Sequence, residues 1–157
     1  MAIEKARNHL AQWHVEHKIQ ELEESSATVE LAALALGCEP ARIAKSLSFL
    51  VNDSAILIVA AGDAKIDNAK YKAVFGTKAK MLGNDNVEAM IGHDVGGVCP
   101  FGVNEGVVIY LDESLKRFTT VFPACGSSNS AIEVTISELE TYTPYEEWID
   151  VCKGWKD

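Results

Sequence analysis

The sequence contains little that would place it in or across a membrane. Its longest apolar run, residues 54–61, has the length of a strand, whereas a membrane-spanning helix needs about 20 apolar residues. The first ten residues mix charged and apolar side chains, so we expect no signal peptide and no membrane partner. The four cysteines form no CxxC pair, which argues against a zinc ribbon or a thioredoxin-type motif. Without a secretion signal we expect reduced thiols and a cytoplasmic protein.

Positive charge is also scarce. The 157 residues include 14 Lys and Arg against 23 Asp and Glu, which gives a net charge of −9. A protein that follows the phosphates of duplex DNA needs a broad basic surface, so we expect no DNA partner. A small basic patch stays open, because five lysines fall close together: Lys65, Lys70, Lys72, Lys78 and Lys80. The alternative for these lysines is a solvated helix face whose charge is balanced by acids elsewhere.

The common catalytic signatures are missing. The sequence has neither GxSxG nor HExxH, and its glycine-rich segment lacks the GK[ST] ending of a phosphate-binding loop and the GxGxxG pattern. His14 and His17 are three residues apart, but no acidic or cysteine partner has a convincing spacing. We therefore expect a solvated helix face at these histidines, no metal site and no cofactor.

The pattern of apolar residues predicts one α+β domain over residues 1–157. Helices are expected at residues 3–18, within 21–40, at 67–76, at 84–92 and at 145–155, with a short helical turn at 40–44 and a capped turn at 137–143. Strands are expected at residues 45–51, 54–61, 106–112, 118–125 and 131–136. Because strands and helices do not alternate, a mixed or antiparallel sheet is favoured over a doubly wound nucleotide fold.

End signals support three of these helices. Ser26 or Thr28 can cap the second helix, and Gly37 ends it. The helix at 67–76 begins near an aspartate and closes at a glycine. Asn84 or Asp85 is expected to cap the helix at 84–92.

The segment "DVGGVCPFG", residues 94–102, is the strongest candidate for a functional loop. Glycines let backbone N–H groups approach a ligand closely, and Pro100 fixes the exit of the loop. Successive exposed amides can bind an oxyanion, although a plain structural turn is the simpler alternative. Cys99 could be a nucleophile, but no histidine spacing supports it and a buried small side chain is the alternative.

Lys45 is the second candidate. It opens the apolar strand "KSLSFLV", where its ammonium group can lie over a pocket. The alternative is a lysine whose charged head simply reaches water.

Four motifs in order resemble one family. "KSLSFLV" at 45–51, "AAGDAKID" at 60–67, "VGGVCPFG" at 95–102 and "VIYLDESL" at 108–115 resemble the YbaK-type family, the free-standing relatives of the editing domain inserted in prolyl-tRNA synthetases. The resemblance extends over residues 28–134. It implies a mixed, barrel-like β-sheet flanked by helices. It also implies hydrolysis of the ester that joins a wrong amino acid to a tRNA, without a protein nucleophile.

The resemblance also assigns roles to residues of this sequence. Lys45, Gly96 and Gly97 are the expected catalytic residues, since amides of the loop can stabilise a tetrahedral oxyanion. The residues of this loop expected to bind the substrate are Val98, Cys99, Pro100, Phe101 and Gly102. Gly126, Ser127 and Ser128 are also expected to bind it, on the polar character of their segment and not on the resemblance. The expected partners are the acceptor end of a tRNA and a synthetase, with a small amino acid on a proline tRNA as the candidate substrate.

The segment 126–130 departs from the commoner members of the family. It is short and polar, so its hydroxyls could select a small or polar amino acid, or it could be a hairpin turn that contacts no ligand. Two further functions stay open at this stage. One is a non-catalytic module that binds tRNA or a synthetase, which a pocket plugged by side chains would favour. The other is a small-molecule hydrolase, which the acidic net charge favours.

Overall fold

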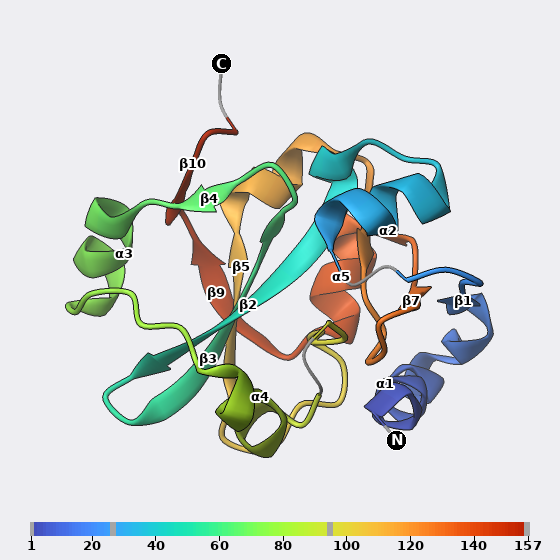
Figure 1. Ribbon diagram of the computed structural model, residues 1–157, viewed down its shortest axis with the longest axis horizontal. Helices are drawn as coiled ribbons and strands as arrows, with labels where there is room; N and C mark the ends of the chain where they lie inside the picture. Colours follow the sequence, from blue (N-terminus) through green and yellow to red (C-terminus); the bar gives the residue numbers. More distant parts are fainter. Residues whose placement is uncertain (1, 26–27, 94–95, 156–157) are drawn as a thin grey trace.

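A curled, six-stranded mixed sheet forms the centre of the protein (Figure 1). The structure is a computed structural model that describes residues 2–25, 28–93 and 96–155. The strand order is β8-β6-β2-β3-β5-β9. The strands are β2 (Ile43–Val51), β3 (Ser54–Ala61), β5 (Val108–Asp112), β6 (Thr120–Pro123), β8 (Val134–Thr135) and β9 (Tyr145–Ile149). Two small sheets pair β1 (Gln20–Glu21) with β7 (Ser130–Ala131) and β4 (Lys65–Ile66) with β10 (Cys152–Lys153).

Helices flank this sheet and confirm the expected α+β class. The α-helices in the described residues are α1 (Ala2–Leu10), α2 (Val29–Leu36), α3 (Asn68–Phe75), α4 (Asn84–Ile91) and α5 (Ile136–Tyr142). Short 3-10 turns complete the list: η1 (Ala11–Trp13), η2 (Glu16–Lys18), η3 (Pro40–Arg42) and η4 (Glu113–Arg117). No helix of the described residues is long and apolar enough to cross a membrane.

The β2–β3 hairpin forms the two central strands of the six-stranded sheet. It confirms the strands expected at 45–51 and 54–61. Its turn residues Asn52 and Asp53 have φ values of 48° and 67°, as a tight two-residue hairpin turn requires. The strands pair antiparallel, with Lys45 opposite Ala60. Residues 55–61 of β3 are all buried. One face of β2 is thereby free to line a pocket while β3 anchors the hairpin in the core.

The helices expected within 21–40, at 67–76 and at 84–92 are confirmed as α2, α3 and α4. Their predicted end signals are confirmed only in part. The Thr28 hydroxyl caps α2 by accepting a hydrogen bond from the Leu31 N–H, whereas Ser26 lies outside the described residues. Asp67 caps α3 in the same way. The cap prediction for α4 was wrong: Gly83 occupies the cap position and Asn84 is already the first helical residue.

The largest error concerns residues 145–155, which form strands β9 and β10 and no helix. β9 pairs in parallel with β5, which would otherwise be an open sheet edge. Tyr145, Trp148 and Ile149 are residues that favour strands, and the sheet edge decides between the two structures.

Three smaller expectations also need correction. The expected turn at 137–143 is the helix α5, which begins with a complete capping box formed by Thr135 and Glu138. The expected strand at 131–136 is divided between β7 and β8. The first helix ends at Leu10, and the 3-10 turn η1 that follows it ends at His14, which adopts a left-handed conformation with φ of 59°.

Candidate functional site

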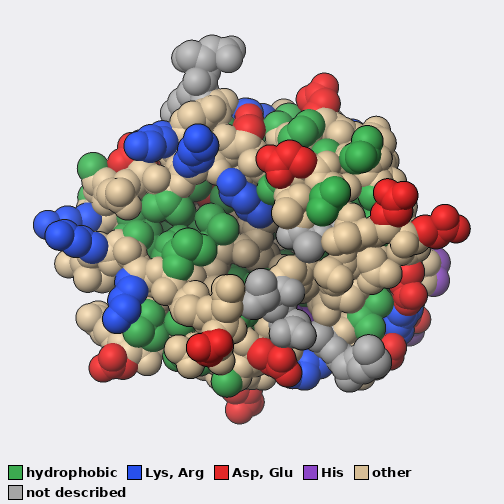
Figure 2. Space-filling model, viewed as in Figure 1, with side chains coloured by type: hydrophobic (Ala, Val, Ile, Leu, Met, Phe, Trp, Pro, Cys, Tyr) green, Lys and Arg blue, Asp and Glu red, His purple; other side chains and the backbone are tan. Residues whose placement is uncertain are grey.

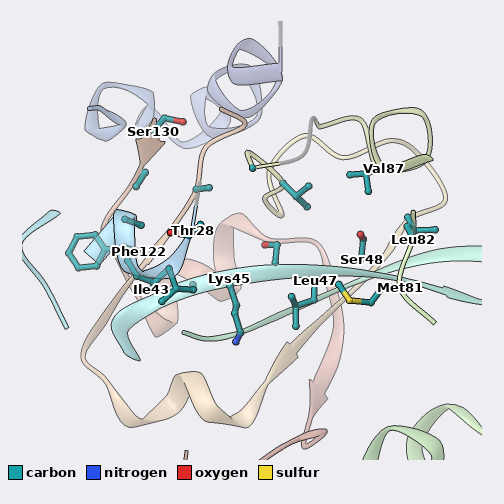
Figure 3. A pocket seen from close by; sticks show the side chains of 18 of the residues that line it. Thr28, Ile43, Lys45, Leu47, Ser48, Met81, Leu82, Val87, Phe122 and Ser130 are labelled. Carbon is teal, nitrogen blue, oxygen red and sulfur yellow. The ribbon is translucent and has the colours of Figure 1, made fainter. Parts of the chain in front are cut away.

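A cavity of about 230 Å³ opens beside β2. Figure 2 shows the face of the molecule on which the surface is hollowed near its centre. β2 forms one side of the cavity, and α2, α4, the loop at 96–98 and the segment 122–131 form the others (Figure 3). The cavity is lined by Thr28, Val29, Ala32, Ile43, Ala44, Lys45, Ser46, Leu47, Ser48, Met81, Leu82, Asn84, Val87, Gly96, Val98, Phe122, Ala124, Ser130 and Ala131.

Most of this lining is apolar, and the main exceptions are hydroxyl groups. Ser46 and Ser48 alternate with Lys45 and Leu47 along β2, so the two serines share one face of the strand. In Figure 3 the Ser48 hydroxyl points to the same side of β2 as Val87, away from Lys45 and Leu47. Sequence reasoning missed both serines, although their alternation in "KSLSFLV" was the available signal.

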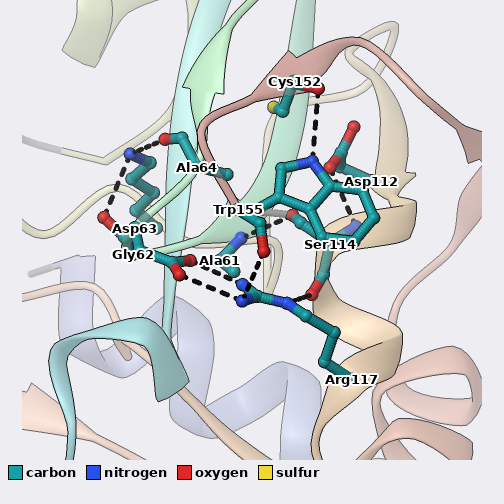
Figure 4. Close-up of polar contacts among 10 residues, drawn as sticks. Ala61, Gly62, Asp63, Ala64, Asp112, Ser114, Arg117, Cys152 and Trp155 are labelled. Carbon is teal, nitrogen blue, oxygen red and sulfur yellow. Dashed lines mark hydrogen bonds and ion pairs between the residues drawn. The ribbon is translucent and has the colours of Figure 1, made fainter. Parts of the chain in front are cut away.

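Lys45 lines the cavity with its strand, but its side chain extends to the other side of β2. Its Nζ donates hydrogen bonds to the carbonyl oxygens of Gly62, at 3.3 Å, and Ala64 (Figure 4). An ammonium group has three N–H donors, so one donor remains for a ligand. Burial lowers the pKa of Lys45, and the nearby carboxylates of Asp63 and Glu30 oppose that shift.

Residues 62–64, which we call the carbonyl loop, are fixed from two sides. A Cβ on Gly62 would lie 2.0 Å from the Pro40 carbonyl oxygen, so only glycine allows this close approach to η3. On the other side, the guanidinium of Arg117 binds both oxygens of Asp63, at 2.5 and 3.0 Å. Arg117 also donates to the carbonyls of Ser114 and Trp155, which joins η4 and the segment after β10 to the loop.

The loop at 96–102 divides into a part that lines the cavity and a part that packs inside. Gly96, with φ of 91°, and Val98 line the cavity, whereas Asp94 and Val95 lie outside the described residues. Gly97 is buried, and a Cβ there would lie 2.6 Å from the Ser127 nitrogen. Gly97 therefore permits close contact between two loops, and its service as an amide donor to a substrate stays a prediction.

The rest of this loop is interior. Cys99, Pro100 and Phe101 are buried and do not line the cavity. Burial raises the pKa of the Cys99 thiol to about 12, so the thiol is protonated at neutral pH. Gly102 has φ of 73° and lies against the backbone of Lys5 in α1.

His93 holds this loop from beneath, a role that sequence reasoning did not assign. It is fully buried, and its Nε2 lies 2.7 Å from the Phe101 carbonyl oxygen and 3.5 Å from Cys99 Sγ. The contact to the carbonyl means that Nε2 carries the proton. Burial lowers the pKa of His93, which keeps the ring neutral.

The polar segment 126–130 contributes Ser130 to the cavity. Gly126 is buried beneath Gly97, and Ser128 is exposed away from the cavity lining. Ser127 Oγ lies 2.6 Å from Ser130 Oγ. The expected binding residues Gly126, Ser127 and Ser128 thus stand one layer outside the cavity, and their contact with a substrate stays a prediction.

The lysines singled out in the sequence lie around α3 and β4. Figure 2 shows Lys and Arg side chains on that side of the face and most Asp and Glu side chains elsewhere. Lys70 is held by Asp150, at 3.0 Å. The other four are exposed: Lys65, Lys72, Lys78 and Lys80.

The histidine pair and the four cysteines belong to no cluster of metal-ligating side chains among the residues that the structure describes. His14 and His17 are exposed and lie on different turns. Within residues 2–25, 28–93 and 96–155, no group of three or more His, Cys, Asp or Glu side chains could hold a metal ion.

Comparison with known proteins agrees with the resemblance seen in the motifs. A family described as "Aminoacyl-tRNA editing domain" matches residues 23–142. An uncharacterized protein of Bacillus subtilis, YwhH, is 55% identical over 99% of this chain and 100% of its own length. EbsC of Enterococcus faecalis, a candidate Cys-tRNA(Pro)/Cys-tRNA(Cys) deacylase, is 28% identical over 76% of this chain and 74% of its own.

A solved structure and a longer enzyme are also similar to this chain. The crystal structure of a candidate trans-editing enzyme for prolyl-tRNA synthetase superposes with a TM-score of 0.86, at 29% identity and over 98% of both chains. The proline–tRNA ligase of Geobacillus sp. (strain WCH70) is 30% identical over 64% of this chain, which spans 18% of that ligase.

Proposed function

The chain belongs to the aminoacyl-tRNA editing domain family, and on this premise we propose that it is a trans-acting deacylase of mischarged tRNA. The observation that carries the proposal is the open cavity, which is lined by Gly96 and by β2, the strand that carries Lys45. The substrate is the ester between an amino acid and the terminal ribose of a tRNA. A small amino acid on a proline tRNA fits the size of the cavity and the relatives' names.

The proposed reaction is a hydrolysis in which water is the nucleophile. Water adds to the ester carbonyl carbon, and the carbonyl oxygen becomes a tetrahedral oxyanion. The backbone N–H of Gly96 stabilises this oxyanion by donating a hydrogen bond. The ester C–O bond then breaks, the ribose oxygen leaves with a proton, and the products are a free amino acid and a tRNA with a free hydroxyl.

In this mechanism Lys45 binds the substrate end of the tRNA through its remaining N–H donor. The carbonyl loop directs the ammonium group, since two of its three donors are already used by Gly62 and Ala64. On that side of the strand the cation attracts the terminal phosphate or the ribose of the tRNA end, while the reacting carbonyl lies on the cavity side. The protonated, interior thiol of Cys99 has no part in the reaction.

A non-catalytic module that binds tRNA or a synthetase is the second candidate. A pocket plugged by side chains would favour it, whereas the cavity here has room for a ligand. A small-molecule hydrolase is a weaker candidate that the acidic surface favours.

A deacylation panel distinguishes these functions. Purified protein is mixed with proline tRNAs that carry alanine, cysteine, serine or proline, and the remaining ester is followed over time. We expect release of at least one non-cognate amino acid and slow release of proline. A protein that binds these tRNAs and releases nothing is a binding module, and one that cleaves only free amino acid esters is a small-molecule hydrolase.

A further inference from the structure

The cavity contains a hydroxyl group that the protein itself does not use. The Oγ atom of Ser46 is buried and has no hydrogen-bond partner among the described residues. Buried hydroxyls are nearly always hydrogen-bonded, and an unsatisfied one costs about 1–3 kcal/mol. Since Ser46 lines the cavity, a ligand in the cavity can supply the missing partner.

A second hydroxyl follows on the same face of the strand. Ser48 is 6% exposed and also lines the cavity, and residues two apart on a strand are separated by about 7 Å. The surroundings of this pair are apolar, with Ala44 on the same strand face and Val87 and Val98 on the facing segments. The two hydroxyls are therefore polar points on this face of β2, and Thr28, Asn84 and Ser130 are the other polar, uncharged residues of the lining.

The charges of the lining residues further restrict which amino acid side chain the cavity accepts. Lys45 is the only ionisable side chain among the described residues that line the cavity. A cationic amino acid side chain would lack a counter-charge there, and burying an unpaired charge is costly. A large aliphatic side chain would leave the Ser46 hydroxyl unsatisfied. A small, neutral side chain that can form a hydrogen bond satisfies both conditions.

We propose that Ser46 and Ser48 select an acyl group with a hydroxyl side chain, of which serine is the smallest. This inference rests on the proposed function, because it concerns the amino acid of the same ester. Preference arises from the hydrogen bond, since a purely apolar pocket of the same size could not strongly distinguish a hydroxyl from a methyl group.

The test compares two esters of nearly equal size on one proline tRNA. Serine and 2-aminobutyrate differ only by a hydroxyl in place of a methyl group. We expect wild-type kcat/KM to be about tenfold higher for the seryl ester. We expect the double variant Ser46→Ala/Ser48→Ala to lower the seryl rate until the ratio approaches one, while the 2-aminobutyryl rate stays within about twofold. Ser54→Ala, an exposed serine at the far end of the hairpin, is the matched control and should keep the wild-type ratio.

Each outcome has a distinct meaning. Equal wild-type rates on the two esters overturn the inference without any variant and leave the deacylase function intact. Equal losses on both esters in the double variant also overturn it, since the hydroxyls would then contact a part that all substrates share. Release of neither amino acid by a protein that is active on another ester of the panel also overturns the inference. Inactivity across the whole panel overturns the proposed function, and this inference falls with it.

Discussion

Arg117 binds both carboxylate oxygens of Asp63, and Asp63 lies between the two residues whose carbonyls accept hydrogen bonds from Lys45. The lysine is therefore positioned by a backbone segment that an ion pair holds from outside the cavity (Figure 4). The guanidinium also lowers the pKa of Asp63 through its hydrogen bonds, which keeps the carboxylate ionised.

Arg117→Ala should reduce deacylation more than it reduces stability. Because the pair is partly exposed, we expect the free energy of unfolding to fall by about 1 kcal/mol or less. A displaced carbonyl loop misplaces Lys45, and we expect kcat/KM to fall about tenfold. Arg117→Lys keeps the charge but loses the two-bonded geometry, so it should recover only part of the activity. Urea unfolding and deacylation kinetics provide the comparison, and wild-type kinetics in Arg117→Ala would show that the ion pair has no part in the site.

Lys45→Ala should leave a folded protein with about 10²-fold lower activity. Two backbone carbonyls lose a donor, so we expect a cost of about 1 kcal/mol in stability. Lys18→Ala, an exposed lysine on η2, is the control for loss of one positive charge. Turnover unchanged in the Lys45 variant, measured with the same charged tRNA, would remove this lysine from the mechanism.

Gly97→Ala should separate two loops that now touch. The added Cβ would meet backbone atoms of Gly126 and Ser127 at 2.6–2.8 Å, and backbone cannot move aside as a flexible side chain can. We expect a loss of about 2 kcal/mol or more in stability, together with most of the activity. Gly83→Ala is the control for an added methyl group, because nothing lies within 4 Å of its Cβ position; as the N-cap of α4 it should lose only about 1 kcal/mol or less. Equal melting temperatures for the two variants would contradict the packing role of Gly97.

Mild acid should destabilise the wild-type protein through His93. Its pKa is lower in the folded than in the unfolded state, so the unfolded state binds more protons as the pH falls below about 6.5. The neutral His93 ring therefore makes its full contribution to the free energy of unfolding at neutral pH. That contribution is lost progressively as the pH falls from about 6.5. His93→Gln keeps a donor for the Phe101 carbonyl but does not titrate. The free energy of unfolding of this variant should therefore change less with pH than that of the wild-type protein. Urea unfolding at pH 7 and pH 5.5 tests this, and identical pH dependence in both proteins would contradict it.

Binding of tRNA should depend only weakly on salt. With a net charge of −9 the protein is expected to contact the acceptor end alone, through Lys45 and exposed lysines near α3. Each neutralised phosphate contributes about −0.7 to −0.9 to the slope of log K against log salt, so we expect a slope no steeper than about −4. Titrations of a full tRNA and a short acceptor-stem mimic measure it. A slope near −8 with much tighter binding of the full tRNA would require a broader basic surface.

Local patterns predicted the parts of the fold in which local and tertiary preferences agree. Thr28 and Asp67 are residue types that commonly cap a following helix, and Asn52 and Asp53 tolerate the positive φ values of the turn between the two apolar strands. The structure of segment 145–149, by contrast, is decided by its tertiary surroundings. It becomes a strand because β5 offers a parallel edge that lies more than thirty residues earlier in the chain, which no local pattern reveals.

The sequence pointed to segments that line the candidate cavity, but not to which residues of each segment face it. Motif order pointed to Lys45 and the loop at 96–100: Gly96 and Val98 line the cavity, whereas Cys99 and Pro100 are buried and the Lys45 side chain extends to the other side of β2. The sequence did not distinguish Gly96, which lines the cavity, from Gly97, which packs beneath it, because both are glycines with no side chain to reveal a direction. The roles of Arg117 and His93 depend on contacts between distant segments and could not be read from spacing.

The order of strands in the central sheet also has a consequence for how fast the chain folds. Ile43 pairs with Phe122, and Ile56 pairs with Val108, so parallel contacts join segments that are far apart in sequence. Such contacts require long loops to close before any pairing energy is gained, which slows folding. During that interval the apolar strand β3 is exposed to other chains. Concentrated refolding from denaturant therefore favours aggregation, whereas dilution gives β3 time to find its neighbours in the same chain.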